Sequence, residues 1–256
     1  MRQEIWITSS IDGTAQPSLF YAAKEKNRPL LVGLHTWSWD RTNQERGLLP
    51  LAEKNGWNLL LPEFRGSNLK RNPNCKDACG SEKAKQDIVD AIHYIEQNYS
   101  IDSKNILLLG ASGGGHMALL MAAYAPKLFR AVGSFVPITD LNKWHEENPN
   151  YREEIEACCG GEPGEGTEQE YQYRSPMTYI SEIAKATVKI FSGKWDSVVP
   201  CHHGLDLYCK IFEQHPKAKV YFEMFDGGHE MPVEMAERWL ISQMDSVAKK
   251  KEQVTG

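Results

Sequence analysis

The sequence predicts an α/β fold in which a mostly parallel central sheet is covered by helices on both faces. Short apolar segments are typical of strands buried on both faces. They lie at residues 29–34, 57–61, 106–109, 131–136, 187–191 and 219–224. Segments with apolar residues at helical spacing alternate with them, which favours parallel βαβ connections. The 256 residues suffice for one such domain and are too few for two of ordinary size, so we expect one domain over residues 1–256.

The remaining elements follow from the same patterns. Residues 4–8 alternate polar and apolar side chains, and residues 19–23 are expected to pair with them as an antiparallel strand across residues 11–17. Apolar spacing predicts helices over residues 48–55 and 81–99, the second capped by Ser81. A helix through residue 212 and a last helix that opens at Pro232 complete the expected order.

Residues 141–179 break this alternation with acidic turns, glycines and tyrosines. We interpret the segment as a small insertion over the active site, a possible lid, because long irregular segments in compact domains are commonly lids or binding loops. The alternative is a solvated loop without a function, since loops vary freely.

Ser112 is the candidate nucleophile. It lies in the sequence G-A-S-G-G at residues 110–114, directly after an apolar strand and before a helix that Pro126 ends. In such a sharp turn the positions two before and two after the serine must carry almost no side chain, and both are glycine here. The pattern alone is also compatible with an ordinary glycine-rich turn, but the strand and helix around it favour a nucleophile elbow.

A serine hydroxyl needs a base within reach and a carboxylate that orients this base. In a strand–elbow–helix arrangement the acid and then the histidine follow the serine, each after a late strand. Asp196 follows one such strand and His229 the next, so we expect them to meet Ser112. Asp226 is the alternative acid. An imidazole titrates near neutral pH, which suits proton transfer.

The oxyanion of an acyl-transfer intermediate requires hydrogen-bond donors. The N–H of Gly113, at the start of the helix, is the expected first donor. The second is expected from the loop after residue 34, at Trp37, with Thr36 as the alternative. His35 is expected to order this loop, and His116, one turn beyond the serine, to pack behind it.

Composition excludes several classes of partner. A net charge of −5 provides no basic surface for nucleic acid or anionic lipid, so the expected partner is a small molecule or a neutral polymer. The chain as given shows no signal or membrane-spanning segment, which predicts a cytoplasmic protein and leaves a secreted mature form open. No cofactor is expected.

The cysteines and paired histidines are expected to have no metal-binding role. The six cysteines lack zinc-type spacing, so free thiols are expected, and Cys75 with Cys79 is the best candidate pair if a disulfide exists. His202 and His203 have no cysteine or carboxylate at ligand spacing beside them, and we expect them to be surface or cleft histidines without a metal.

Five motifs together resemble the prolyl-oligopeptidase-like branch of the α/β hydrolases, over residues 29–240. They are L-H at residues 34–35, F-R-G-S at 64–67, the elbow, residues 193–200 around Asp196, and G-H at 228–229. The resemblance implies the α/β-hydrolase fold and a Ser-His-Asp serine hydrolase. Related stand-alone domains are commonly carboxylesterases, including enzymes that remove feruloyl or acetyl groups from plant polysaccharides.

The chain also departs from that family. Its peptidases carry a β-propeller before the catalytic domain, and 28 residues precede the first buried strand here, so no gating by size is expected. The usual His-Gly-Gly is His35-Thr36-Trp37, and Gly113 replaces a frequent aromatic residue after the serine.

We expect hydrolysis of carboxylic esters through an acyl-enzyme, with a peptidase or aminoacyl hydrolase as the alternative. A peptidase would require an anchor for a peptide N-terminus, for which the acidic pairs at residues 146–147 and 153–154 are candidates. A noncatalytic binding protein on the same scaffold is a third reading. Four tryptophans are expected to line an aromatic substrate cleft: Trp37, Trp39, Trp144 and Trp195.

Overall fold

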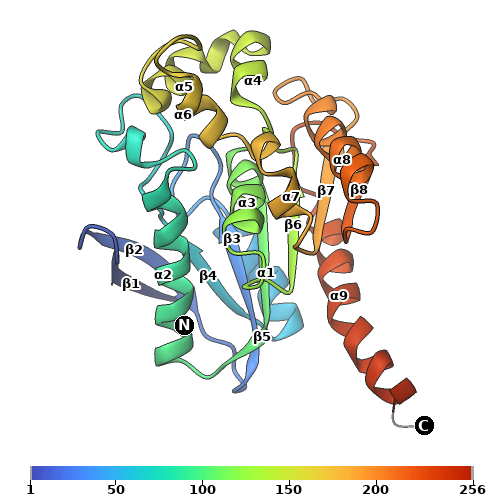
Figure 1. The fold of residues 1–256 in the computed structure, drawn as a ribbon. Coiled ribbons are helices and arrows are strands. Elements are labelled where there is room, and N and C mark those ends of the chain that lie inside the picture. The colour runs from blue at the N-terminus through green and yellow to red at the C-terminus, as the bar shows by residue number, and fades with distance from the viewer. Residues whose placement is uncertain (1, 255–256) are drawn as a thin grey trace.

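Eight strands form one sheet in the computed structural model, which describes residues 2–254 (Figure 1). In chain order they are β1 (Arg2–Thr8), β2 (Ala15–Tyr21), β3 (Arg28–Leu34), β4 (Asn58–Pro62), β5 (Ile101–Ala111), β6 (Ala131–Phe135), β7 (Val188–Gly193) and β8 (Val220–Phe225). The spatial order is β1-β2-β4-β3-β5-β6-β7-β8. The strands from β4 to β8 run parallel, and β1 and β2 are antiparallel at one edge. The predicted α/β fold with a mostly parallel sheet is confirmed.

The N-terminal hairpin is tighter than predicted. Thr8 pairs with Ala15, so β2 begins four residues before the expected Leu19. Asp12 explains the difference, because its Oδ1 accepts hydrogen bonds from the N–H and the hydroxyl of Thr14 (3.1 and 2.7 Å) and closes the turn. Ser9 N–H donates to Thr14 O across the same turn (2.8 Å).

Helices cover both faces of the sheet. On one face lie α1 (Glu45–Asn55) and α9 (Val233–Val254). The other face is covered by α2 (Glu82–Asn98), α3 (Gly113–Tyr124), α7 (Ile180–Ile183) and α8 (His202–Gln214). The predicted cap of α2 is present, since the Ser81 hydroxyl accepts the Ala84 N–H at 3.1 Å.

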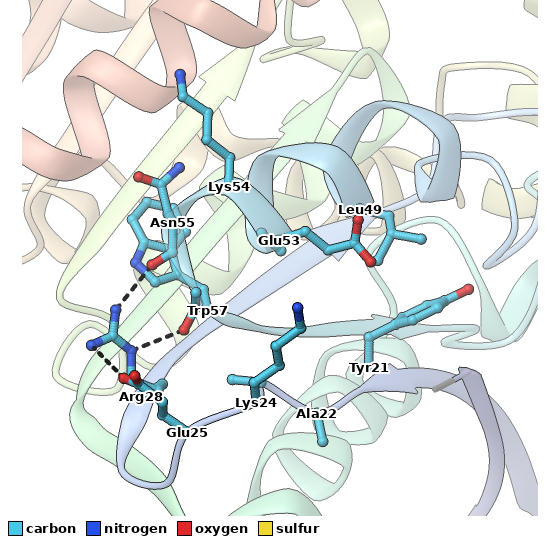
Figure 2. A pocket seen from close by; sticks show the side chains of 13 residues that line it. Tyr21, Ala22, Lys24, Glu25, Arg28, Leu49, Glu53, Lys54, Asn55 and Trp57 are labelled. Carbon is cyan, nitrogen blue, oxygen red and sulfur yellow. Dashed lines mark hydrogen bonds and ion pairs between the residues drawn. The ribbon is translucent and has the colours of Figure 1, made fainter.

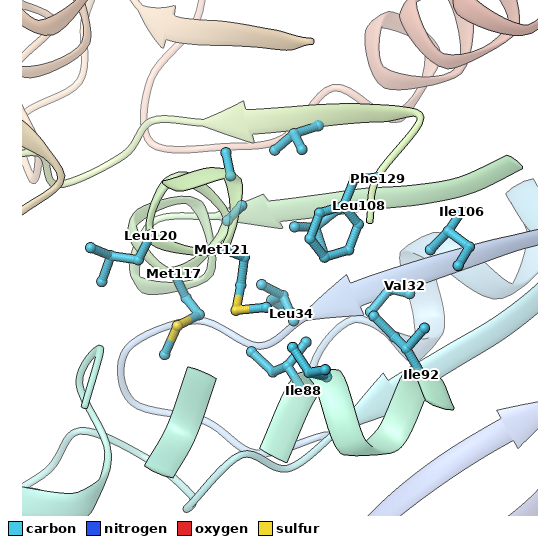
Figure 3. Close-up of a cluster of buried hydrophobic side chains, with 14 of the residues drawn as sticks. Val32, Leu34, Ile88, Ile92, Ile106, Leu108, Met117, Leu120, Met121 and Phe129 are labelled. Carbon is cyan, nitrogen blue, oxygen red and sulfur yellow. The ribbon is translucent and has the colours of Figure 1, made fainter. Parts of the chain in front are cut away.

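Successive residues of the central strands supply two different cores. In β5, Leu108 packs with α2 and α3 (Figure 3), whereas Leu107 and Leu109 pack with α1 and α9. Side chains that alternate in direction and are buried on both sides explain the continuous apolar runs in the sequence. This double burial fixes β5 at the centre of the sheet and holds its carboxyl end, where Ser112 follows, in a defined position.

The 141–179 segment is helical rather than irregular, which corrects the sequence prediction. It contains α4 (Leu141–Glu147), α5 (Arg152–Cys159), α6 (Glu168–Tyr173) and two 3₁₀ turns, and Figure 1 shows α4, α5 and α6 together at one end of the sheet. Asp140 caps α4 by accepting the N–H groups of Asn142 and Lys143 (3.0 and 3.2 Å), and Gly160 ends α5 with φ of 93°. Helices this short leave too few turns for a clear periodicity in the sequence.

Two further expectations concern cysteines and membranes. The six cysteines are free thiols, including Cys75 and Cys79, as the default reading of the sequence predicted. Across the part of the chain that the structure describes, no helix combines the length and the apolar character needed to cross a bilayer.

Candidate active site

Ser112 sits at the sharp turn between β5 and α3. Its backbone has φ of 56° and ψ of −121°, a strained conformation for a residue with a side chain. A Cβ added to Gly110 would lie 2.1 Å from Gly114 O, and one added to Gly114 would lie 2.4 Å from Leu34 O. The two glycines are therefore required for the turn. Ser112 N–H donates to Phe135 O of β6 at 2.9 Å, which ties the strained residue to the neighbouring strand.

Asp196 and His229 form a hydrogen-bonded pair. Nδ1 of His229 lies 2.7 Å from Oδ2 of Asp196, whose side chain is fully buried. The other carboxylate oxygen, Oδ1, accepts the N–H groups of Val198 and Val199 at 2.8 and 2.9 Å. These two donors fix the carboxylate, so that its remaining oxygen faces the imidazole.

Asp226, the alternative acid, has a different partner. Its Oδ1 accepts the indole N–H of Trp195 at 2.7 Å. The structure thus brings Asp196, rather than Asp226, to His229.

Ser112 and His229 line the same cavity, which has a volume of about 590 Å³. It opens beside the carboxyl ends of β3 and β5, where ligands of parallel sheets bind. Its wall includes residues that were not predicted from the sequence, among them Arg46, Glu230 and Tyr151. Glu230 follows His229 directly and could have been found by its position, whereas Arg46 on α1 and Tyr151 in the insertion carry no motif.

The loop at residues 35–40, called the oxyanion loop here for the donor predicted in it, runs against the start of α3. A Cβ added to Gly113 would lie 2.4 Å from the Trp37 backbone N, so these two backbone segments touch beside Ser112. The Thr36 N–H donates to Asn43 Oδ1 at 3.0 Å and is engaged there. No acceptor for the Trp37 N–H occurs within residues 2–254. Of the two candidate donors from this loop, the Trp37 N–H is the one left available.

His35 and His116 are not part of the cavity wall. The His35 ring is buried, stacks on Phe64 with centroids 3.9 Å apart, and lies 2.8 Å from Glu63 O. His116 is fully buried behind the elbow, with Nε2 2.6 Å from Arg174 O. Desolvation lowers the pKa of His116 to about 4, so its ring is neutral and packed. Their placement agrees with structural roles.

The four tryptophans do not form one cleft. Trp39 is 61% exposed and lines the cavity, as expected. Trp195 is 65% exposed but is not part of the cavity wall. Trp144 is fully buried, donates its indole N–H to Val198 O at 2.9 Å, and is withdrawn as a substrate-binding residue. The indole of Trp37 is 1% exposed and packs on Trp144 with centroids 5.0 Å apart, so this side chain offers no stacking face to a substrate.

A second hollow of about 540 Å³ lies beside the amino ends of β3 and β4, away from Ser112 (Figure 2). Within the described part of the chain its wall includes no serine, cysteine or histidine. The Arg28 guanidinium at its edge donates to Asn55 O and Gly56 O at 3.0 and 2.9 Å. The described wall of this second hollow therefore lacks the nucleophile and the imidazole that acyl transfer requires.

Comparison with known proteins agrees with this geometry. Residues 49–249 match the model of the prolyl oligopeptidase family. The YtmA protein of Bacillus subtilis (strain 168), named an uncharacterized peptidase, is 25% identical over 167 residues, which are 65% of this chain and 63% of YtmA. The chain thus spans less than two thirds of that relative.

Solved structures show the same fold at low sequence identity. An acylaminoacyl peptidase from Pyrococcus horikoshii is 19% identical with a TM-score of 0.70, over 89% of this chain and 37% of its own. An esterase from Pyrococcus furiosus is 16% identical with a TM-score of 0.70, over 98% of this chain and 91% of its own. These likenesses establish the α/β-hydrolase fold. Since the family model covers most of the chain, this protein belongs to the prolyl oligopeptidase family of serine hydrolases.

Proposed function

We propose that this protein is a carboxylic ester hydrolase that works through an acyl-enzyme on Ser112. The serine oxygen attacks the acyl carbon while Nε2 of His229 takes the hydroxyl proton, and Asp196 holds Nδ1–H. The N–H groups of Gly113 and Trp37 stabilise the oxyanion. The imidazolium returns its proton to the departing alcohol. A water molecule, activated by the same imidazole, then releases the carboxylic acid and restores the serine.

One observation carries the proposal. The buried Asp196 carboxylate lies 2.7 Å from Nδ1 of His229, and the histidine shares a cavity with Ser112 on its strained turn. A hydrogen bond to Nδ1 keeps the proton there and leaves Nε2 as the acceptor, which is the form a general base requires.

Three of the four acidic residues considered as peptide anchors are already engaged, which supports an ester over a peptide. Glu147 is bound to His202 at 2.9 Å, and Glu153 pairs with Lys70 at 3.1 Å. Glu154 accepts the backbone N–H of Lys70. These carboxylates already have partners, so they offer a weaker anchor for the amino group of a peptide than free carboxylates would.

Trp39 supports an aromatic or sugar-linked ester as the substrate. Its exposed indole belongs to the wall of the cavity that contains Ser112, and a flat ring stacks well on a phenolic acyl group or a sugar face. Feruloyl esters and acetyl esters of carbohydrates are therefore the substrates we propose to compare first.

The nucleophile is tested with a fluorophosphonate probe, which forms a covalent bond with an activated serine. Labelling of the wild-type protein and none of Ser112→Ala is expected. A matched control is Ser38→Ala, because Ser38 lines the same cavity on the oxyanion loop and has no assigned role. Labelling that survives in Ser112→Ala, or wild-type protein that stays unlabelled, would contradict the proposal.

The choice of substrate is tested by parallel turnover of p-nitrophenyl acetate, a feruloyl ester and aminoacyl p-nitroanilides. We expect the esters to have the higher kcat/KM, and Trp39→Ala to raise KM for the feruloyl ester more than for the acetate. Faster turnover of the anilides would make the protein a peptidase or aminoacyl hydrolase instead.

A further inference from the structure

Three side chains with metal-binding atoms converge between helix α4 of the insertion and helix α8. Glu147 is the last residue of α4, and His202 and His203 are the first two of α8. Nε2 of His202 lies 2.9 and 3.0 Å from the two carboxylate oxygens of Glu147, and Nε2 of His203 lies 3.2 Å from Oε2. All three ligand atoms lie within 4.8 Å of one another.

The sequence offers no cysteine or carboxylate at ligand spacing beside the two histidines. The fold supplies a carboxylate from 55 residues away, that of Glu147. The three residues also differ in exposure. His203 is buried, His202 is half-buried, and Glu147 is exposed, which leaves the cluster open to solvent on one side.

We propose that Glu147, His202 and His203 form a binding site for a divalent transition-metal ion, with Zn²⁺ as the preferred ion. Two imidazole nitrogens and one carboxylate oxygen are a donor set that Zn²⁺ uses, with water as the fourth ligand. Tetrahedral ligands at about 2.05 Å from the ion lie roughly 3.4 Å apart. The separations of 2.9–3.2 Å between the carboxylate and the imidazoles are close to this value. The three ligand atoms lie within 4.8 Å of one another, so the two imidazole nitrogens would close around the ion.

The fold holds the His203 ring in place beside Glu147. Its side chain is fully buried between Glu147 and Thr139. The Thr139 N–H donates to Nδ1 of His203 at 3.4 Å, and the Thr139 hydroxyl oxygen lies 3.4 Å from the same nitrogen. That hydroxyl donates to His203 O at 2.8 Å. These contacts orient the ring with Nε2 toward Glu147.

The charge balance near the site also permits a cation. Lys143 lies one turn before Glu147 on α4, and Asp206 on α8 pairs with it at 2.7 Å. Its charge is therefore compensated, and Lys143 does not compete with an incoming ion for the Glu147 carboxylate.

A metal at this site would stabilise the packing of α4 on α8, which hydrogen bonds connect to the candidate active site. Trp144 and Asn148, near the end of α4, both donate to Val198 O, at 2.9 and 3.0 Å. Val198 in turn donates its N–H to Asp196, the proposed catalytic acid. An ion bound by Glu147, His202 and His203 would link α4 to α8 next to these hydrogen bonds. We therefore expect the ion to stabilise the insertion against the acid loop without taking part in acyl transfer.

The experiment is calorimetric titration of the EDTA-treated full chain with Zn²⁺, together with visible spectra of the Co²⁺ form. We expect one Zn²⁺ per chain, a Co²⁺ spectrum with the intense bands of four-coordination, and a Tm that rises by roughly 5–10 °C at one hundred times Kd. Glu147→Gln and His202→Gln each remove an accessible ligand and should weaken Zn²⁺ binding at least tenfold.

Two other histidine–carboxylate pairs provide matched controls. His145 lies 2.8 Å from Glu156 in the insertion, and His229 pairs with Asp196 in the candidate active site. His145→Gln and His229→Gln should leave Zn²⁺ affinity and the Co²⁺ spectrum unchanged. Equal affinity of wild type, Glu147→Gln and His202→Gln, or loss of binding in His229→Gln alone, would overturn the proposal. This outcome is independent of the esterase test, because binding is read without turnover.

Discussion

Replacing Asp196 by asparagine should invert the tautomer of His229 with almost no change in shape. In the wild-type protein Oδ1 of Asp196 accepts two backbone N–H groups, at 2.8 and 2.9 Å, and Oδ2 faces Nδ1 of His229 at 2.7 Å. An asparagine will keep its oxygen toward the two backbone donors, because turning the amide over would forfeit both hydrogen bonds, about 2 kcal/mol in all. Its NH₂ group therefore faces Nδ1 and makes this nitrogen an acceptor.

The consequence is a large loss of turnover. With Nδ1 as acceptor the imidazole proton sits on Nε2, which can no longer take the proton of Ser112. We expect kcat for p-nitrophenyl acetate to fall about 10⁴-fold, or about 5.5 kcal/mol in the activation barrier. The Tm should change little, since the side chain keeps its volume and its two backbone hydrogen bonds.

Asp226→Asn is the matched control. Asp226 accepts the Trp195 indole N–H at 2.7 Å through an oxygen that asparagine retains, so kcat should stay within about threefold of wild type. The reasoning is refuted if Asp196→Asn keeps more than about a tenth of the wild-type kcat, or if Asp226→Asn loses as much activity as Asp196→Asn.

Three further predictions concern the elbow, acid stability and a buried ion pair. Gly113→Ala places a Cβ 2.4 Å from the Trp37 backbone N, so the two segments must move apart, and kcat should fall about 10²–10³-fold together with a lower Tm. Activity near wild type would contradict the role proposed for this backbone contact beside Ser112. Burial lowers the pKa of both His116 and His203 to about 4. Below pH 6.5 the unfolded chain takes up protons that the folded chain does not, so the free energy of unfolding should be constant above pH 6.5 and fall by about 3 kcal/mol per histidine as the pH drops to 4. Urea titrations across this pH range should show a smaller fall in the free energy of unfolding for His116→Gln than for wild type. An equal fall in both proteins would show that His116 does not contribute to the acid sensitivity. Arg65→Met leaves the buried Asp87 carboxylate, now 2.5 Å from the guanidinium, without its partner and should cost about 3–5 kcal/mol in urea unfolding, part of which a second change of Asp87 to Asn should restore.

The sequence was sufficient to predict the sheet and the placement of three side chains. Continuous apolar runs mark strands such as β5 that are buried on both faces, and they leave Ser112, Asp196 and His229 in loops at carboxyl ends of the sheet. Parallel strands bring these ends together whatever the distance along the chain. This is why residues up to 117 positions apart could be assigned to one site from the sequence.

Contacts between side chains of different elements could not be predicted from the sequence in this way, because they depend on the direction in which each side chain points. Glu147 meets His202 because the end of α4 lies over the start of α8, and no local pattern records that contact. The turn at Asp12 is another case, since it shortened the first hairpin through a side-chain hydrogen bond rather than through a strand signal. Both depend on geometry that appears only once the elements are in place.

Trp37 shows why the aromatic cleft was overestimated and what the insertion does instead. A tryptophan in a loop beyond a strand gives the same sequence signal whether its ring faces a ligand or a neighbouring element. Here the ring packs on Trp144, in a cluster of buried apolar residues that also includes Val199 of the acid loop, while the backbone of Trp37 touches Gly113. The core of the insertion therefore holds the oxyanion loop and the acid loop at the same time. Truncating Trp144 to alanine should lower kcat as well as stability although this residue touches no substrate, because it supports both loops that acyl transfer uses.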